Sequence, residues 1–576
     1  MNLTPNERIA GVLAPLFALR TEDDLGIGDV AGLRQFIEWA RALGFKLVQL
    51  LPINETGGDN SPYNAISSRA IDPTTLQLAP GVPEDLSAED FAEVTGKVDL
   101  AALRRGQVKY HRVKPLKRAL LERAFAAFRE RPPNESFEAF CTAESAWLHD
   151  YTLFRALMEI NDERETWDEW PQPDMTAAQA WLDSLGEKDR ADFERRRQFL
   201  CYVQWIAHQQ WQAVKHFAAE RDVVLMGDVP FGISYYSADV FAHPERFRLD
   251  WSGGAPPEPY FKDDKFTQKW GQNWGIPVYD WDEMRKHHFE WWRQRVDGVK
   301  EIFHLFRIDH VLGFYRIYAF PWRPRHNQEF FPLSWEEMRA RTGGREPHFA
   351  PRDDRSAENC AANQREGEEY LRVALEESGE TRVVGEDLGT VPDYVRPSLR
   401  SLGIAGFKIP QWENYPNHRS IPGRAYERLS VATYATHDHK PLRALWDEAF
   451  GRSSDHAKQA RHDLAKIAEF AGLPAPDEAT DFLGDFYPAI FEALFRSESW
   501  IAVVMITDLL GRKDRFNVPG TATNSNWARR LHATVAKLGG GHALQRQLGL
   551  VRRLLEVSGR IQPRIDTDET RTKVKK

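Results

Sequence analysis

A short apolar run that ends in a polar or charged residue, followed by a loop and a helical pattern, recurs along this 576-residue chain. The clearest runs cover residues 223–228, 305–309, 382–386 and 431–438, and four more cover residues 11–14, 46–51, 404–408 and 502–507. Uninterrupted apolar runs of this length are typical of strands that are buried on both faces of a parallel sheet. Amphipathic helices are expected at 30–43, 281–302, 391–402 and 441–470.

Eight strands alternating with helices predict an α/β fold, most simply a (β/α)8 TIM barrel. A doubly wound open sheet produces the same alternation, so it remains the alternative fold. We expect a single elaborated catalytic domain over residues 1–558. The uneven spacing places insertions at the C-terminal face of the strands, because about 170 residues separate the second and third predicted strands. The predicted insertions are a helical segment at 81–200, a lid of long loop at 235–280, and two further segments at 320–375 and 440–500. The first part of the 320–375 segment, to about residue 352, is expected to be a long loop. Residues 559–576 are expected to form a polar, frayed tail.

Composition excludes several classes of protein. The net charge of −9 is modest for this length, which argues against a nucleic-acid partner. The three cysteines are far apart in sequence, so neither a disulfide framework nor a structural zinc site is expected. The first residues carry no apolar signal core, and no apolar run approaches the roughly 20 residues of a membrane helix. We therefore expect a cytoplasmic protein without membrane contact; no pattern assigns an oligomeric state.

Four acidic residues stand at the ends of predicted strands: Asp228, Asp309, Glu386 and Asp438. An isolated acid in this position often caps the helix that follows. Catalytic side chains of a barrel, however, come from the C-terminal ends of several strands. Four acids at equivalent positions therefore favour a catalytic cluster over four separate caps.

Two of these acids differ in their neighbours. Arg307 precedes Asp309 by two residues, so both side chains point to one face of the strand and the guanidinium can hold the carboxylate ionised. Glu386 follows the apolar pair Val383 and Val384 and has no basic neighbour in sequence, which favours a raised pKa and a proton donor. Reactions at glycosidic bonds require two carboxyl groups in these different protonation states.

Three segments resemble, in order, signature motifs of the α-amylase clan: FRIDH at 306–310, GEDLG at 385–389 and THD at 436–438. The finer pattern is similar to the 4-α-glucanotransferases of glycoside hydrolase family 77, the amylomaltases and disproportionating enzymes. SPY at 61–63 resembles their donor-site tyrosine motif, and GAPP at 254–257 with GQNWGIP at 271–277 resembles their lid. RFNVPGT at 515–521 with Asn526 and Trp527 resembles their last barrel-strand motif. The resemblance extends from about residue 11 to residue 531.

The resemblance implies a role for each matching residue. Asp309 would be the nucleophile, Glu386 the general acid and base, and Asp438 the transition-state stabiliser. Substrate contacts or support of the site are implied for Arg307, His437, Asp228, Tyr63, Asn517, Trp274 and His310. The implied substrates are maltooligosaccharides and starch- or glycogen-type glucans, and the mechanism needs neither a cofactor nor a metal. The sequence departs from common family members at His439-Lys440-Pro441 and in the longer lid between Pro257 and Gly271.

Three other interpretations remain open. The stretch from His437 to His439 contains metal-ligand residue types, although neighbouring residues of a strand point to opposite faces and cannot easily share one ion. The same carboxylates would serve an α-glucan hydrolase, in which water resolves the intermediate in place of a sugar. A catalytically silent glucan-binding protein is the third, and the three retained acids argue against it.

Overall fold

The computed structural model describes residues 3–258, 264–451, 455–521, 523 and 525–562. Eight strands form one parallel sheet in the order β10-β11-β12-β1-β2-β3-β6-β9. Their bounds are β1 Ile9–Leu13, β2 Leu47–Gln49, β3 Val224–Val229, β6 Leu305–Ile308, β9 Arg382–Gly385, β10 Gly406–Lys408, β11 Ser430–Ala432 and β12 Ile501–Met505. All eight predicted strands are present.

The two outer strands of this sheet also meet. Val384 of β9 forms a parallel bridge with Ala405, just before β10, and the N–H of Gly385 donates to the carbonyl of Ala405 at 2.9 Å. The sheet therefore closes into a barrel, and the TIM-barrel prediction is confirmed over the open-sheet alternative.

Helices surround the barrel and pack on one another in the order α19, α21, α1, α8, α12, α15 and α16. Their bounds are α1 Val30–Leu43, α8 Glu187–Ala219, α12 Glu290–Ile302, α15 Ala357–Ser378, α16 Val395–Ser401, α19 Tyr487–Arg496 and α21 His542–Val557. The predicted helix at 30–43 is α1 itself. It begins where Asp29 accepts from the N–H groups of Ala31 and Gly32 and ends at Gly44, whose φ of 101° favours glycine.

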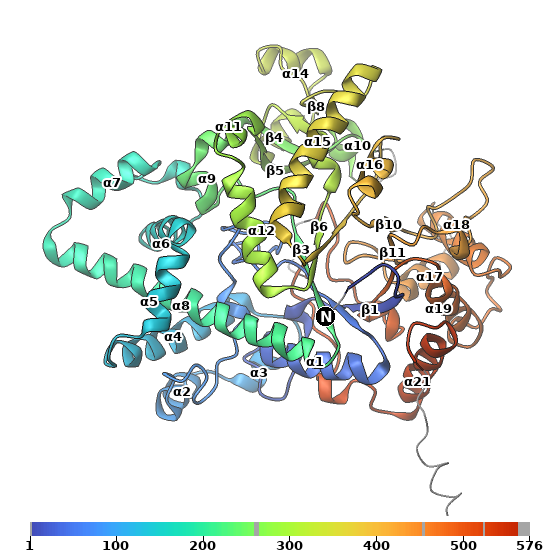
Figure 1. Cartoon of the computed structure of the whole chain (residues 1–576), viewed down its shortest axis with the longest axis horizontal. Helices are drawn as coiled ribbons and strands as arrows, with labels where there is room; N and C mark the ends of the chain where they lie inside the picture. The colour runs from blue at the N-terminus through green and yellow to red at the C-terminus, as the bar shows by residue number, and fades with distance from the viewer. Residues whose placement is uncertain (1–2, 259–263, 452–454, 522, 524, 563–576) are drawn as a thin grey trace, which may run out of the picture.

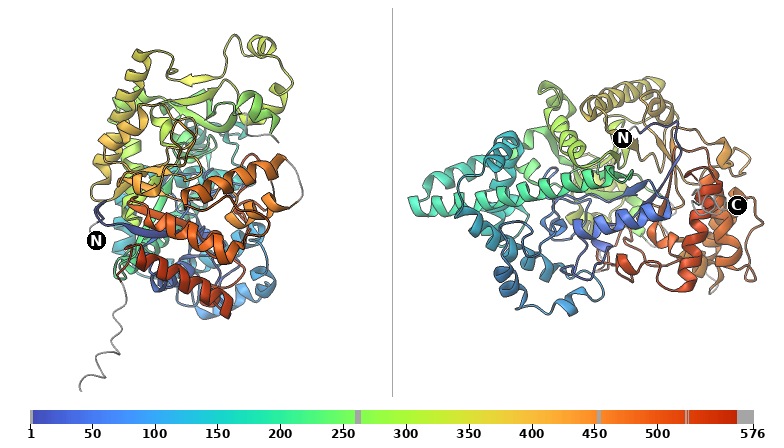
Figure 2. Two further views of the ribbon diagram at one scale, coloured as in Figure 1. Left: turned by 90° about the vertical axis from the view of Figure 1, so that its right-hand side faces the viewer. Right: turned by 60° about the horizontal axis from the view of Figure 1, so that its bottom comes forward.

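The chain between β2 and β3 is helical. It contains α2 Ala88–Thr95, α3 Leu100–Arg104, α4 Tyr110–Arg129, α5 Glu135–Ala143, α6 Ser145–Ile160 and α7 Met175–Ser184, and it returns to the barrel through α8. Figure 1 shows this segment on the left and α17 Leu442–Phe450, α18 Asp455–Phe470 and α19 on the right. The right-hand view of Figure 2 shows the same separation, with the two groups at opposite sides of β1.

The prediction of long loops at 235–280 and 320–352 is wrong in part. These segments contribute strands to a second, antiparallel sheet in the order β5-β4-β7-β8. Its strands are β4 Phe247–Ala255, β5 Gln272–Tyr279, β7 Ile317–Phe320 and β8 His348–Ala350. Short helices accompany it: α9 Ala238–Ala242, α10 Lys265–Trp270, α11 Trp281–Lys286, α13 Asn327–Phe330 and α14 Trp335–Arg341. Residues 247–251 of β4 do alternate between apolar and polar side chains, whereas β5 contains Gly275 and Pro277 and shows no such alternation. Tyr260 and Phe261, in the longer lid segment, lie outside the described residues.

Other elements are shorter than predicted. The expected helix at 281–302 is two helices, α11 and α12, because His288 and Phe289 adopt positive φ between them. The helix expected at 441–470 is α17 and α18, and residues 452–454 between them lie outside the described residues. The strand expected at 431–438 ends at Ala432, and the one at 502–507 gives way after Met505 to the short helix α20 Ile506–Leu509.

Residues 559–576 were expected to form a frayed tail, and those from 563 onward lie outside the described residues. Arg560 contradicts this expectation, because it is fixed in the protein interior. The Arg560 side chain is buried and donates to five backbone carbonyls, those of Ile9, Phe495, Ser497, Ser499 and Trp500. Over the residues that the structure describes, no helix has both the length and the hydropathy needed to cross a membrane.

Candidate active site

Arg307 forms the centre of the candidate site. The register of the barrel places Arg307 on β6 directly opposite Asp228 on β3. One guanidinium nitrogen lies 2.7 Å from each oxygen of Asp228, and another lies 2.6 Å from Oδ1 of Asp309. Asp228 and Arg307 are buried, whereas the Asp309 side chain is 29% exposed. The predicted contact between Arg307 and Asp309 is therefore present, and of the two carboxylates that Arg307 binds, Asp309 is the one open to a substrate.

Glu386 follows β9, the next strand of the barrel, and its backbone N–H continues the ladder to Ile308. Its carboxylate accepts a hydrogen bond from the backbone N–H of His310 at 2.9 Å. Burial raises the pKa of Glu386 to about 8; Arg307 opposes this shift, and the charge of Asp309 adds to it. This environment favours the protonated form of Glu386 at neutral pH, whereas the Asp309 carboxyl lies 2.6 Å from the guanidinium of Arg307.

Asp438 lies in a turn after β11, and three groups hold it. The imidazole Nε2 of His437 lies 3.2 Å from Oδ2, the amide of Asn517 donates to Oδ1 at 2.6 Å, and Arg515 donates to the backbone carbonyl of Asp438. Burial opposes ionisation of Asp438, but His437 and Asn517 outweigh it and lower its pKa below the ordinary value. The side chain is 42% exposed, so it offers a fixed negative charge to the solvent side of the barrel.

Three aromatic rings form a cluster beside these acids. Tyr63 and His437 stack with centroids 4.9 Å apart and planes 13° apart, and Trp527 lies 5.8 Å from each of them. The hydroxyl of Tyr63 donates to Asp228 at 2.6 Å, and burial together with that carboxylate raises the pKa of the phenol. Aromatic faces of this kind stack on the apolar faces of sugar rings.

The second sheet covers another side of the site. Trp274 on β5 is 38% exposed, and its ring meets the ring of His310 at 4.7 Å in an edge-to-face arrangement. His310 follows Asp309 directly and adopts φ +47°, a strained conformation that is typical of functional sites. Burial lowers the pKa of His310 to about 4, so its imidazole is neutral at physiological pH.

All ten predicted site residues belong to two groups of contacts, which meet where His310 directly follows Asp309 in the chain. Their links are Trp274–His310, His310–Glu386, Arg307–Asp309, Arg307–Asp228, Asp228–Tyr63, Tyr63–His437, His437–Asp438 and Asp438–Asn517. Sequence reasoning assigned no role to Arg515, Trp527 or Tyr110, whose hydroxyl donates to the carbonyl of Trp527 at 2.7 Å. Arg515 was detectable, because it precedes Asn517 by two residues and alternation places both on one face.

The geometry of His437, Asp438 and His439 differs from that assumed for a metal site. The three residues form a turn, and not a strand. Nδ1 of His439 accepts from the backbone N–H of Thr436 at 3.0 Å, so this nitrogen is occupied. Within the described residues, no group of three or more histidine, cysteine, aspartate or glutamate side chains is arranged to hold an ion.

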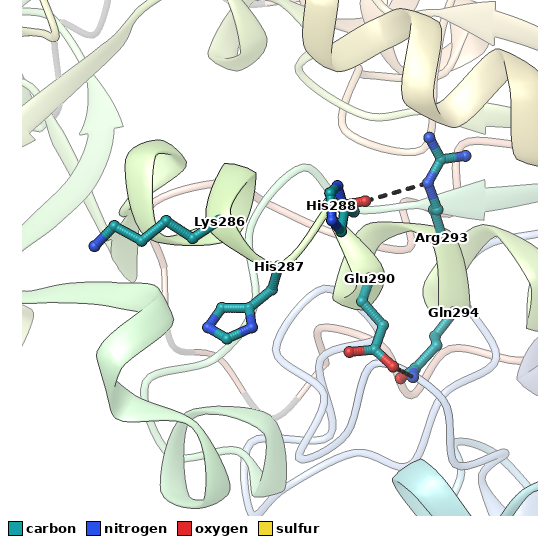
Figure 3. Close-up of a pocket in the computed structure, with 6 residues that line it drawn as sticks. All are labelled: Lys286, His287, His288, Glu290, Arg293 and Gln294. Atoms are coloured by element: carbon teal, nitrogen blue, oxygen red, sulfur yellow. Dashed lines mark hydrogen bonds between the residues drawn. The ribbon is translucent and has the colours of Figure 1, made fainter.

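A surface cavity of about 480 Å³ lies between α11 and α12, away from the two groups of site residues. It is lined by Lys286, His287, His288, Glu290, Arg293 and Gln294 (Figure 3). Within it Gln294 donates to Glu290 and Arg293 donates to the carbonyl of His288. Its basic groups pair with acids outside the lining, Lys286 and His287 with Glu283 and Arg293 with Glu376. It contains none of the predicted site residues.

A family model described as 4-alpha-glucanotransferase matches residues 14–535, more than nine-tenths of the chain. The chain belongs to the 4-alpha-glucanotransferase family. Among its relatives, the 4-alpha-glucanotransferase of Chlamydia muridarum is 28% identical over 544 residues and covers 92% of each chain. The 4-alpha-glucanotransferase of Aquifex aeolicus is 28% identical over 535 residues, which is 91% of this chain and 95% of the relative.

Solved structures agree on the fold. The amylomaltase from Corynebacterium glutamicum superimposes with a TM-score of 0.75 at 21% identity over 96% of this chain and 76% of its own. The amylomaltase from Streptococcus agalactiae, solved in complex with acarbose, has a TM-score of 0.71 at 20% identity. This superposition covers 96% of this chain and 100% of the amylomaltase. The family assignment that the motifs predicted is confirmed, and the TIM barrel with it.

Proposed function

We propose that the protein is a retaining 4-α-glucanotransferase that moves α-1,4-glucan segments between maltooligosaccharides, with starch- or glycogen-type glucans as further donors. One observation carries the proposal: two carboxyl groups at the ends of adjacent barrel strands lie in opposite electrostatic environments. A guanidinium nitrogen of Arg307 lies 2.6 Å from Asp309, while burial raises the pKa of Glu386 to about 8. Retaining cleavage requires one ionised nucleophile and one proton donor.

In the first step an oxygen of Asp309 attacks C1 of the donor sugar. The C1–O bond to the leaving segment breaks as Glu386 gives its proton to the glycosidic oxygen, and a glucosyl ester forms on Asp309. The fixed charge of Asp438 lies where it can stabilise the positive charge that develops on the sugar ring. Tyr63, stacked on His437, supplies an aromatic ring for the donor sugar, and the exposed ring of Trp274 supplies a second substrate contact beside His310.

The second step reverses the proton transfer. Esterification removes the negative charge of Asp309, and that charge is one of the groups raising the pKa of Glu386. The pKa of Glu386 therefore falls in the intermediate, and Glu386 becomes a base. It takes the proton of an acceptor 4-hydroxyl as that oxygen attacks C1 and releases Asp309. A single Glu386 thus serves both steps because its pKa follows the charge of Asp309.

Incubation with maltotriose alone tests the proposal. A transferase produces a ladder of shorter and longer oligomers, whereas hydrolysis yields only glucose and maltose and excludes the transferase assignment. Asp309→Asn is the matched variant, because it keeps the shape of the side chain and removes its nucleophilic charge. We expect it to lose several orders of magnitude in rate, since nucleophile and acid act as a unit. An Asp309→Asn variant that retains the ladder, or an inactive wild type, would exclude the assignment.

A further inference from the structure

His439 directly follows Asp438 in the turn after β11. Its ring is held by Thr436, whose backbone N–H donates to Nδ1 at 3.0 Å and whose hydroxyl lies 2.8 Å from the same nitrogen. A backbone N–H can only donate, so Nδ1 carries a lone pair and the ring proton resides on Nε2. Burial lowers the pKa of His439 to about 4, against the opposing charge of Asp438, so the imidazole stays neutral.

Among the residues that the structure describes, Thr436 is the hydrogen-bond partner of the His439 ring, and it binds Nδ1 and not the Nε2–H group. The His439 side chain is half-buried, and Nε2 is not among the buried polar atoms that lack a partner. The ring of Trp412 lies 5.1 Å from the His439 ring, and this tryptophan is 50% exposed. A donor N–H beside an exposed indole ring can recognise a sugar. The N–H binds a sugar hydroxyl, and the indole packs against the sugar ring.

The position of this pair indicates which sugar it meets. Trp412 follows β10, which lies next to β9 and therefore next to Glu386. The Tyr63 and Trp527 rings belong to the segments after β2 and β12, and they meet His437, on the side of the β11 segment away from β10 and Trp412. Because Glu386 exchanges its proton with the departing and the incoming oxygen, the acceptor sugar must lie on the Glu386 side.

We propose that His439 is a specificity-determining residue that donates a hydrogen bond from Nε2 to a hydroxyl of the acceptor sugar, which rests against Trp412. The inference rests on the proposed transferase function. It assigns His439 a direct contact with the acceptor, beyond the structural hydrogen bonds to Thr436. Asp438, in contrast, is held by His437 and Asn517.

Two-substrate kinetics with α-maltosyl fluoride as donor and maltose as varied acceptor test this contact. His439→Phe keeps a ring against Trp412 and removes the donor. One neutral hydrogen bond is worth about 1 kcal/mol, so we expect the acceptor KM to rise about 5- to 10-fold. Fluoride release without added acceptor should fall by a smaller factor. His439→Gln, which restores an N–H donor, should recover most of the acceptor KM.

Lys440→Gln is the control, because the Lys440 ammonium is paired with Glu448 at 2.7 Å, and its acceptor KM should match the wild type. An unchanged acceptor KM in His439→Phe would overturn the proposal. So would an equal loss in fluoride release and transfer without rescue by His439→Gln, which is the pattern of a purely structural residue. A wild type that releases fluoride but forms no transfer product would overturn the proposed function itself.

Discussion

Replacing Glu386 by glutamine should make the stability of the free protein less dependent on pH. A buried carboxyl group with a raised folded pKa destabilises the fold only when it must ionise. The cost is absent below the unfolded pKa of 4.5 and grows as the pH rises to the folded pKa of about 8. Since each pH unit between two pKa values is worth about 1.4 kcal/mol, the full difference corresponds to roughly 5 kcal/mol.

Urea unfolding at pH 5, 6, 7 and 8 measures this effect. The free energy of unfolding of Glu386→Gln should rise relative to the wild type by up to about 3.5 kcal/mol between pH 5 and pH 8, the part of the full difference that falls in this range. Groups common to both proteins cancel in the comparison. Glu130→Gln, at an exposed glutamate after α4, is the control and should run parallel to the wild type.

A second arm isolates the contribution of Asp309. The charge of Asp309 raises the pKa of Glu386, so the pH-dependent effect of Glu386→Gln should be smaller when Asp309→Asn is already present. A stability difference that is constant from pH 5 to pH 8 would refute the reasoning. It would mean that Glu386 is already ionised at neutral pH and cannot be the proton donor.

Two further changes test contacts that the sequence did not reveal. Tyr110→Phe removes the hydrogen bond to the carbonyl of Trp527, a residue held at φ +59°. The variant should lower the free energy of unfolding in urea by about 1 kcal/mol and raise the KM for the donor several-fold. An unchanged donor KM would show that Trp527 needs no such support. Arg560→Met leaves buried carbonyls unpaired and should lower the free energy of unfolding by about 3–5 kcal/mol. Arg546→Met, at an exposed position of α21, is the control and should leave the free energy of unfolding nearly unchanged. Equal effects of the two variants would contradict a stabilising role of the Arg560 hydrogen bonds.

The sequence predicted the barrel and the clustering of four acids because both depend on local patterns. Buried parallel strands are continuous apolar runs, and the acids that end four of these runs lie at the same edge of the sheet. The pairing of Arg307 with Asp309 was also predictable, since two residues of one strand separated by one position share a face.

Contacts between distant segments were not predictable. The bond between Arg307 and Asp228 depends on the register of β3 against β6, which no local pattern reveals. Arg560 lies in a polar stretch, and its burial depends on carbonyls contributed by residues 9 and 495–500. The antiparallel pairing of β4 with β5 contains two register shifts, which no local pattern in the sequence reveals.

The most direct test of the account is to identify the residue that carries the sugar. α-Maltosyl fluoride needs no acid to leave, so Glu386→Gln can still form the ester, but it lacks the base that resolves it. Rapid quenching followed by peptide mass spectrometry should then find a maltosyl group on Asp309. An adduct on any other residue, or products with inverted anomeric configuration and no adduct, would contradict a retaining mechanism through Asp309.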